Sequence, residues 1–261
     1  LLFYDVTTLY FESFEEDELR KQGFSKDNKS QQPQILVALM VTKEGFPIAY
    51  EIFTGNTFEG HTILPSIKSF IEKHQVAHFT VIADAAMISS PNIEALQSNN
   101  INYIVGARLG NISTDLLNNI DKQISREDGK SIRVKTDKGY LICSYASNRY
   151  KKDKYEMEKQ IEKAKSVVEK PSKNKKIKFI KTNEEKIEIN KALIDKTQKL
   201  LGIKGYYTNL DEKLVSNQVV IERYHELYKI EQAFRISKND LKTRPIFHFK
   251  EEPIKLHILL C

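Results

Sequence analysis

The sequence is poor in several features that would mark particular classes of protein. It contains no Trp and only two cysteines, Cys143 and Cys261, which are too few for a disulfide framework or a cysteine-based metal site and fit a reducing cytoplasm. No apolar run approaches the roughly 20 residues that a membrane-spanning helix needs. The opening segment LLFYDVTTLYF lacks the basic start and the small-residue cleavage site of a secretory signal peptide. We therefore expect a cytoplasmic protein.

Positive charge is plentiful and is gathered in two blocks. The formal net charge is +6, with 29% charged and 40% hydrophobic residues. From Arg149 to Lys181 there are 13 Lys/Arg against 5 Asp/Glu, a net charge of +8, and from Ile221 to Lys250 there are 7 against 4, a net charge of +3. Such blocks favour contact with a phosphate backbone, although a solvated helix face is the alternative.

Apolar runs in residues 1–109 predict a mixed α/β sheet. The expected strands are Leu2–Phe11, Pro33–Val41, Phe46–Phe53, His78–Ala86 and Asn102–Arg108, and the expected helices are Phe58–His74 and a segment from Ser90 to Leu96. A turn over Thr42–Gly45 joins the second and third strands as a hairpin. The order predicts three antiparallel strands that continue into parallel β-α-β units.

Residues 110–204 break this pattern and predict an insertion subdomain between two parts of one core, 1–109 and 205–261. Arg133–Ser147 reads as a β-hairpin, Tyr155–Lys170 as a charged helix and Lys173–Lys181 as a basic extended segment. We expect this insertion to be mostly β, with one basic helix.

The segment Tyr224–Lys242, YHELYKIEQAFRISKNDLK, carries the most specific signal. As a single helix with about 100° per residue, it would gather one acid, two tyrosines and three cations within roughly 80° of each other. These residues are Tyr224, Tyr228, Glu231, Arg235, Lys238 and Lys242. An acid among bases suits a metal-bound carboxylate beside a phosphate backbone. The alternative is a solvated face on which Glu231 and Arg235 form an i,i+4 ion pair.

Two further acids stand inside apolar strands. Asp5 interrupts LLFYDV, and Asp84 lies in VIADAA. Carboxylates in buried strands are costly unless they are paired or bind a metal. Oxygen ligands suit Mg²⁺ or Mn²⁺, so Asp5, Asp84 and Glu231 predict a site for one or two such ions. Ordinary strand-end residues are the alternative for both aspartates.

At these positions the sequence resembles the DDE transposases of bacterial insertion sequences, in the IS-four group of the RNase H-like superfamily. That group carries the signature Y-x2-R-x3-E-x6-K, which here reads Tyr224, Leu227 in place of Arg, Glu231 and Lys238. Other segments are similar to one branch of the group, among them YDVTTLYFES, GFSKDNKSQQPQ, IADAAMIS, GYYTN and FRISKNDLKTRPIFH. The resemblance runs over nearly the whole chain.

The resemblance implies an RNase H-like fold in which Asp5, Asp84 and Glu231 bind two Mg²⁺ ions, with Mn²⁺ as a substitute. It implies that Tyr224 and Lys238 contact transposon-end DNA, and charge adds Arg235, Lys242 and Arg244 as candidate DNA contacts. The implied function is cut-and-paste transposition of double-stranded DNA, by a homodimer on paired ends, at the bacterial nucleoid.

Relatives continue beyond both ends of this chain, so we expect a chain truncated at both ends. Two alternatives to an active transposase stay open: a truncated remnant that binds DNA without catalysis, and a stand-alone RNase H-like nuclease. His61 and His248 are more often structural than catalytic in such settings. Glu59 lies where the family often has Asp. Lys26 and Asp27 lie in a polar loop. The loop could approach DNA, but exposure to solvent is the simpler interpretation.

Overall fold

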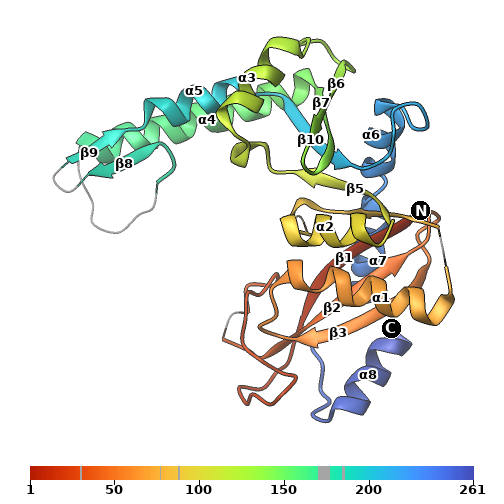
Figure 1. The fold of residues 1–261 in the computed structure, drawn as a ribbon. Helices are drawn as coiled ribbons and strands as arrows, with labels where there is room; N and C mark the ends of the chain where they lie inside the picture. The colour runs from red at the N-terminus through yellow and green to blue at the C-terminus, as the bar shows by residue number, and fades with distance from the viewer. Residues whose placement is uncertain (30, 77, 88, 170–176, 184–185) are drawn as a thin grey trace. The chain divides into compact units, whose positions relative to one another are not determined.

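The structure is a computed structural model of residues 1–261, and it describes all of them except 30, 77, 88, 170–176 and 184–185. Part of the expected basic segment Lys173–Lys181 therefore lies outside the described residues. The chain divides into two compact units (Figure 1). Unit 1 contains Leu1–Gly106, Asp137–Gly139 and Tyr207–Cys261, and unit 2 contains Ala107–Thr136 and Tyr140–Tyr206.

The main sheet is mixed, with the strand order β3-β2-β1-β4-β5-β10-β7-β6. The strands of unit 1 are β1 (Leu2–Tyr10), β2 (Gln34–Val41), β3 (Pro47–Thr54), β4 (Thr80–Ala83) and β5 (Asn102–Ala107). Strands β1, β2 and β3 are antiparallel neighbours, whereas β4 is parallel to both β1 and β5. This arrangement confirms the predicted RNase H-like mixed sheet.

Two helices follow the antiparallel strands of unit 1, as the sequence predicts. They are α1 (Ile63–His74), preceded by the 3₁₀ turn Glu59–His61, and α2 (Ser90–Ser98), which Ser89 caps by accepting a hydrogen bond from the Asn92 N–H. The hydroxyl group of Tyr4 on β1 donates to Thr62 at the start of α1, over 2.6 Å. Helix α1 therefore covers the sheet face to which Tyr4 points.

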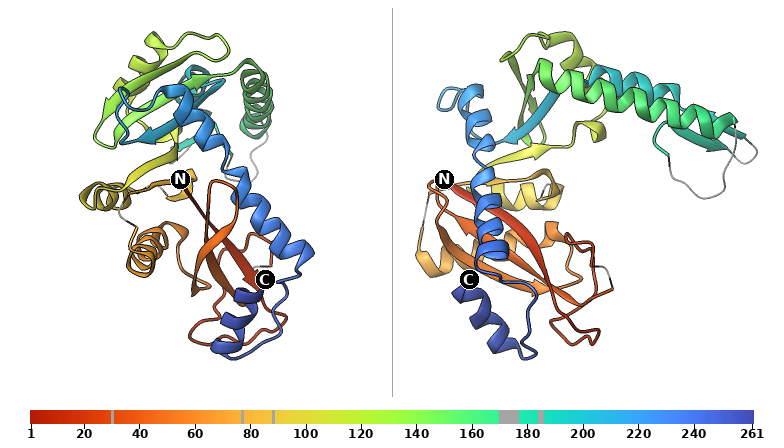
Figure 2. Two further views of the ribbon diagram at one scale, coloured as in Figure 1. Left: turned by 90° about the vertical axis from the view of Figure 1, so that its right-hand side faces the viewer. Right: turned by 180° about the vertical axis from the view of Figure 1, so that it is seen from behind.

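The opposite face of these strands is covered by α7 (Tyr228–Arg235), which packs against β1 and β2. Figure 2 shows α1 and α7 on opposite sides of the unit 1 strands. Thr7 and Leu9 of β1 line one cavity together with Phe234 of α7. Because residues two apart in a strand share a face, Asp5 belongs to the face that α7 covers.

The segment Tyr224–Lys242 is not the single regular helix that the sequence predicts. Helix α6 (Asn217–His225) ends before α7 begins, and a π-helical turn, η4 (Ile236–Asp240), follows α7. Hydrogen bonds over three residues, from the Leu227 N–H to Tyr224 O and from the Ile230 N–H to Leu227 O, tighten the chain between α6 and α7. Leu227 and Ile230 are both buried. The stripe calculated from an ideal helix is therefore interrupted twice.

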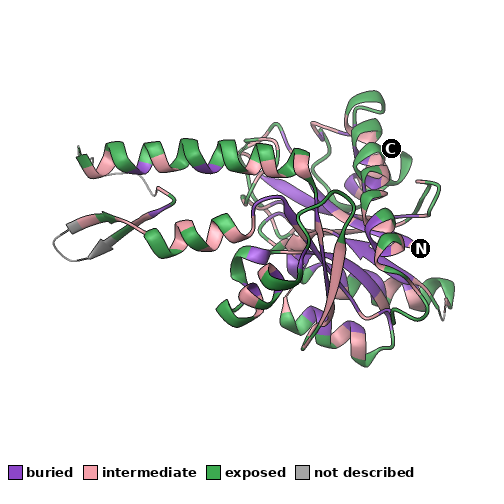
Figure 3. Ribbon diagram, turned by 90° about the horizontal axis from the view of Figure 1, so that it is seen from above, coloured by how far each residue is buried: buried purple, intermediate pink, exposed green. Residues whose placement is uncertain are grey.

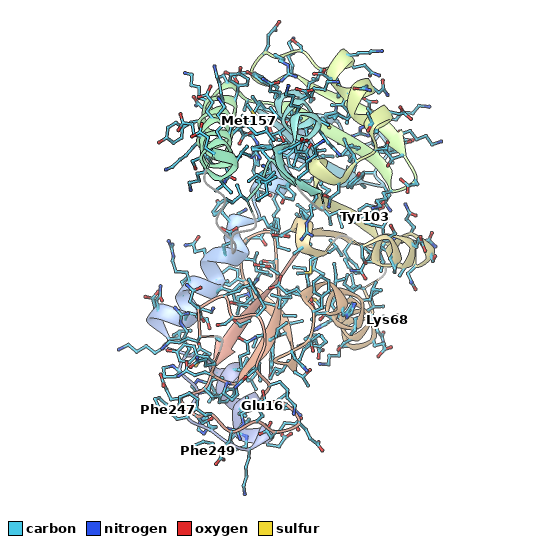
Figure 4. All side chains as sticks on the ribbon, turned by 90° about the vertical axis from the view of Figure 1, so that its left-hand side faces the viewer. Glu16, Lys68, Tyr103, Met157, Phe247 and Phe249 are labelled. Atoms are coloured by element: carbon cyan, nitrogen blue, oxygen red, sulfur yellow. The ribbon has the colours of Figure 1, made fainter. Side chains whose placement is uncertain are left out.

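The chain ends in α8 (Glu251–Leu260), whose Ile254 packs into a cluster on β1 and β2 that includes Leu9, Phe11 and Ile35. Phe247 and Phe249, just before this helix, lie at the surface (Figure 4). Within the residues that the structure describes, no helix is long and apolar enough to cross a membrane.

Unit 2 holds β6 (Ser131–Thr136), most of β7 (Gly139–Tyr145) and of β10 (Ile203–Thr208), and the two-stranded sheet of β8 (Ile180–Asn183) and β9 (Lys186–Ile189). Its helices are α3 (Thr114–Gln123), α4 (Ser147–Glu169) and α5 (Lys191–Lys199). More residues of unit 2 lie in helices than in strands, whereas we expected a mostly β insertion. The reason is that α4 begins eight residues before the expected charged helix, and that Lys191–Lys199 is also helical.

Helix α4 is largely exposed along its length (Figure 3). Its buried residues, Met157 and Ala164, pack with Phe179 and Leu201 in a small cluster (Met157 is labelled in Figure 4). The Lys and Arg residues of this helix lie mostly in solvent. The basic block predicted here is thus exposed along α4, which fits both contact with a phosphate backbone and a solvated helix face.

Candidate functional site

Asp5 and Asp84 are brought together by the parallel pairing of β1 with β4. The register pairs Phe3 with Ile82 and Tyr4 with Ala83, and the next residue on each chain is an aspartate. Both aspartates are partly exposed, although the residues on either side of Asp5 are buried. Two carboxylates therefore meet at an opening in an otherwise apolar sheet.

Burial and neighbouring charges act together on Asp5. Burial, the largest cause, raises the pKa of its carboxyl group from 3.8 to about 6. The Lys26 ammonium and a backbone hydrogen bond oppose this rise, and the carboxylates of Asp84 and Glu59 add to it. Asp5 thus lies in a site where negative charge exceeds positive charge.

Glu59, in the 3₁₀ turn before α1, joins the two aspartates as a third neighbouring acid. Its carboxylate lies 2.8 Å from the Lys26 ammonium, which also donates to the carbonyl oxygen of Val6 over 2.5 Å. The backbone N–H of Lys26 donates to the Thr8 hydroxyl, which fixes this loop along β1. In the sequence, Glu59 was indicated only by its position, where the family often has Asp. No signal in the sequence linked Lys26 to the acids.

The backbone around Asp84 forms a tight turn. The Ala86 N–H donates to the Asp84 carboxylate, and the Met87 N–H donates to the Asp84 carbonyl oxygen over 3.3 Å. The residues after Asp84 form the 3₁₀ turn Ala85–Met87. This turn fixes the direction of the Asp84 carboxylate at the end of β4.

Tyr224 of α6 reaches the same region. A Cβ atom added to Gly106 on β5 would lie 2.5 Å from the Tyr224 hydroxyl oxygen and 3.2 Å from the Ala85 nitrogen. The tyrosine hydroxyl and the residue that follows Asp84 thus approach one point above β5. Only glycine at position 106 leaves room for this approach.

Glu231 is exposed on α7. Along the chain it lies between Tyr224, whose hydroxyl group approaches Gly106, and Phe234, which lines a cavity together with Thr7. Its helix packs on the face of β1 that carries Asp5. Over the described ranges, however, no three His, Cys, Asp or Glu side chains are close enough together to hold a metal ion. The structure brings Asp5 and Asp84 together and leaves Glu231 on the adjoining helix.

The predicted C-terminal cations fall into two groups. Lys238 and Arg244 both form ion pairs with Asp27, at 3.4 Å for Lys238. Arg235 and Lys242 are exposed. The ion pairs of Asp27 join residues more than 200 positions apart, and no local pattern in the sequence indicates them.

The two candidate histidines have aromatic neighbours. The rings of His61 and Phe58 lie 5.4 Å apart, and the rings of His248 and His257 also lie 5.4 Å apart. These contacts are edge-on, with interplanar angles of 73° and 63°.

The donor set at the acidic site fits a hard divalent cation. Asp5 and Asp84 offer carboxylate oxygens only, the ligand type that Mg²⁺ and Mn²⁺ prefer, whereas Glu59 is paired with Lys26. The pKa of Asp5 is raised partly by the other two carboxylates, and a bound cation would offset that repulsion.

Comparison with known proteins adds a family and a fold. The family model described as "Transposase DDE domain" matches residues 1–261. A solved structure, the cryo-EM structure of a piggyBac transposase synaptic complex with hairpin DNA, is similar with a TM-score of 0.54 and 12% sequence identity. The match covers 98% of this chain and 43% of that one, so this chain spans less than half of that chain's length. No curated protein matches the sequence.

Proposed function

The chain belongs to the family of transposase DDE domains, and from this membership we propose that it is a transposase catalytic domain. It would cut DNA strands at the ends of a mobile element and transfer the freed 3′-hydroxyl groups to target DNA. The observation that carries the proposal is the placement of Asp5 on β1 beside Asp84, which directly follows β4, with the pKa of Asp5 raised to about 6. A protein gains no stability from two adjoining carboxylates, so their placement favours a role in chemistry.

We propose that Asp5, Asp84 and Glu231 hold two Mg²⁺ ions, for which Mn²⁺ can substitute. When bound, such ions activate a water or a 3′-hydroxyl group and stabilise the leaving oxygen. The chain's own part is to hold Asp5 and Asp84 at fixed positions in the sheet. Glu231 is the third member because α7 covers the face of β1 that carries Asp5, and because its position matches the family signature.

The DNA contacts in this proposal come from the C-terminal segment. Tyr224 would contact the transposon-end backbone, supported by the approach of its hydroxyl group to Gly106 on β5, which Ala85 also approaches. Lys238 would contact a phosphate group, as its signature position implies. The cations added from charge alone are Arg235, Lys242 and Arg244.

The setting of the reaction also belongs to the proposal. Three of the four signature positions match the IS-four group. Because this group belongs to bacterial insertion sequences, we infer a bacterial protein that associates with the nucleoid. Such a transposase would join two element ends as a homodimer on double-stranded DNA. Light scattering of the chain with and without end DNA would show whether two copies assemble.

The test is nicking of supercoiled plasmid by the purified chain with Mg²⁺, with Mn²⁺ and with EDTA. The variants are Asp84→Asn and Glu231→Gln, which remove one charge each and keep the side-chain size. Glu94→Gln is the matched control, because Glu94 is an exposed carboxylate on α2. We expect metal-dependent nicking by the unchanged chain and by Glu94→Gln, and a loss of at least about 100-fold in the other two.

Other outcomes separate the alternatives. Salt-sensitive DNA binding in all variants without any nicking would favour a DNA-binding remnant. Nicking that persists in Asp84→Asn and Glu231→Gln would contradict the triad. Metal-dependent nicking that never proceeds to strand transfer, even with end DNA supplied, would favour a stand-alone nuclease.

A further inference from the structure

Asp27 lies between two cations from the C-terminal segment. Its carboxylate accepts from the Arg244 guanidinium through one oxygen and lies 3.4 Å from the Lys238 ammonium through the other. The side chains of Asp27 and Lys238 are 15% and 11% exposed, so this contact is largely shielded from water. An ion pair so shielded is screened less by salt than one at the surface.

The backbone between the two cations is closed into a compact turn. The Thr243 N–H and hydroxyl group both donate to the Ser237 carbonyl oxygen, at 3.1 and 2.8 Å. The hydroxyl groups of Ser237 and Thr243 lie 2.6 Å apart, and Thr243 is buried. Lys242 adopts the left-handed conformation, with φ of 53°, which allows the chain to reverse here. This turn places Arg244 beside Lys238.

The charges at this turn do not balance. Two cations face one carboxylate, and Lys26, the neighbour of Asp27 in the loop, is close enough to act on Lys238. Burial, the largest cause, lowers the pKa of Lys238, and repulsion from Arg244 and Lys26 adds to this while Asp27 opposes it. A second anion would therefore stabilise the cluster. Lys26 also pairs with Glu59 in the acidic site, so the cluster adjoins that site.

We propose that Asp27 is a positioning residue that holds Lys238 and Arg244 side by side as a binding site for one phosphate group of the DNA backbone. The excess positive charge is the binding site, and the carboxylate fixes its geometry. This inference rests on the proposed function, because it places that phosphate group next to the acids that would cleave DNA. An alternative is that Asp27 competes with the phosphate group and must leave.

The two possibilities predict opposite effects of removing Asp27. Removal of a negative charge near DNA should tighten binding if the residue only competes or repels. If Asp27 positions the cations, Asp27→Asn and Asp27→Ala should weaken binding roughly tenfold, because the cations no longer meet the phosphate group in a charge-assisted hydrogen bond. The slope of log affinity against log salt should also become shallower, by about 0.9 for each phosphate group that the variant no longer binds.

The experiment measures fluorescence anisotropy of a labelled duplex of arbitrary sequence with the whole chain at several salt concentrations. The matched control is Asp17→Ala. Asp17 is also a loop carboxylate that binds an arginine, Arg20, over 2.6 Å, but it lies outside the cluster. We expect Asp17→Ala to bind DNA like the unchanged chain even where its melting temperature falls. Asp27→Glu keeps the carboxylate, so it should bind DNA more tightly than Asp27→Asn or Asp27→Ala do.

Arg244→Gln keeps the inference testable if Asp27→Ala does not fold. We expect it to reduce the salt slope as Asp27→Asn does, and the double variant to lose little more affinity than either single one. Unchanged or tighter binding by Asp27→Asn would overturn the inference, as would absence of DNA binding by the unchanged chain. Failure of the proposed function would give a different result. The unchanged chain would bind DNA and would need Asp27 for this binding, but it would not nick the DNA.

Discussion

The carboxyl group of Asp5 adjoins that of Asp84 because the parallel register that pairs Tyr4 with Ala83 continues by one residue on each strand. A slip of one residue would turn one of the two aspartates to the other face of the sheet. The apolar side chains that fix the register, such as those of Phe3 and Ile82, thus also fix the distance between the acids. The packing of the sheet therefore determines the geometry of the candidate site.

The raised pKa of Asp5 predicts a pH-dependent cost to stability. The carboxyl group ionises near 3.8 in the unfolded chain and at about 6 in the fold, so ionisation favours unfolding as pH rises between these values. At about 1.36 kcal/mol per pKa unit the cost is about 3 kcal/mol above pH 6 and is absent below pH 4. Asp5→Asn should therefore be more stable than the unchanged chain at pH 7.5, by about 2–3 kcal/mol.

Urea unfolding at pH 4, 5, 6 and 7.5 measures this difference. The two chains should have similar stability at pH 4 and should diverge as pH rises. A difference that is the same at all four pH values would show that the substitution acts through packing and not through the charge of Asp5.

Lys26 lowers the pKa of Asp5, so its removal should raise that pKa further. Lys26→Met also breaks the ion pair with Glu59, at a cost of about 1 kcal/mol in the free energy of unfolding at neutral pH. Carbon-detected NMR titration of the aspartate carboxyl groups measures the first effect. Lys29→Met, a change in the same loop at a lysine over the Tyr10 ring, should leave the Asp5 titration in place.

The approach of Tyr224 to Gly106 predicts a coupled pair of substitutions. Gly106→Ala would place a methyl group 2.5 Å from the tyrosine hydroxyl oxygen and should cost about 1–3 kcal/mol through overpacking. Tyr224→Phe removes that oxygen and leaves the ring carbon at 3.2 Å, so Gly106→Ala should cost less in that background. Additive losses in thermal unfolding of the double variant would contradict the contact.

The two thiols should differ in reactivity. Burial raises the pKa of Cys143 to about 12, which leaves almost no thiolate at neutral pH, whereas Cys261 is partly exposed. A thiol-reactive dye should label one cysteine in the folded chain and both in urea. Rapid labelling of two thiols in buffer would show that β7 opens on the timescale of the experiment.

The sequence was sufficient where side-chain burial alone decides the structure. Runs such as PQILVALMV are so apolar that they predict a buried strand by themselves. Strands β1, β2, β3 and β5 lie within one or two residues of the expected bounds. Asp5 and Asp84 were expected together because carboxylates in apolar strands suggest a shared metal site, and the pairing of β1 with β4 places Asp84, directly after β4, beside Asp5.

The sequence was insufficient where the backbone leaves regular geometry. Periodicity assumes about 3.6 residues per turn, so it could not foresee the tightened turns at Leu227 or the π-helical turn that directs Lys238 toward Asp27. The partnership of Asp27 with Arg244 depends on the fold of the whole unit. The roles assigned to Tyr224, Glu231 and the C-terminal cations stay predictions.

The most direct test of the central claim is calorimetric titration of Mn²⁺ into the purified chain and into its Asp5→Asn, Asp84→Asn and Glu94→Gln variants. If Asp5 and Asp84 hold a catalytic metal ion, the unchanged chain and Glu94→Gln should bind Mn²⁺ alike. Asp5→Asn and Asp84→Asn should each bind it at least tenfold more weakly. Equal Mn²⁺ affinity in all four proteins would contradict a metal site at this pair.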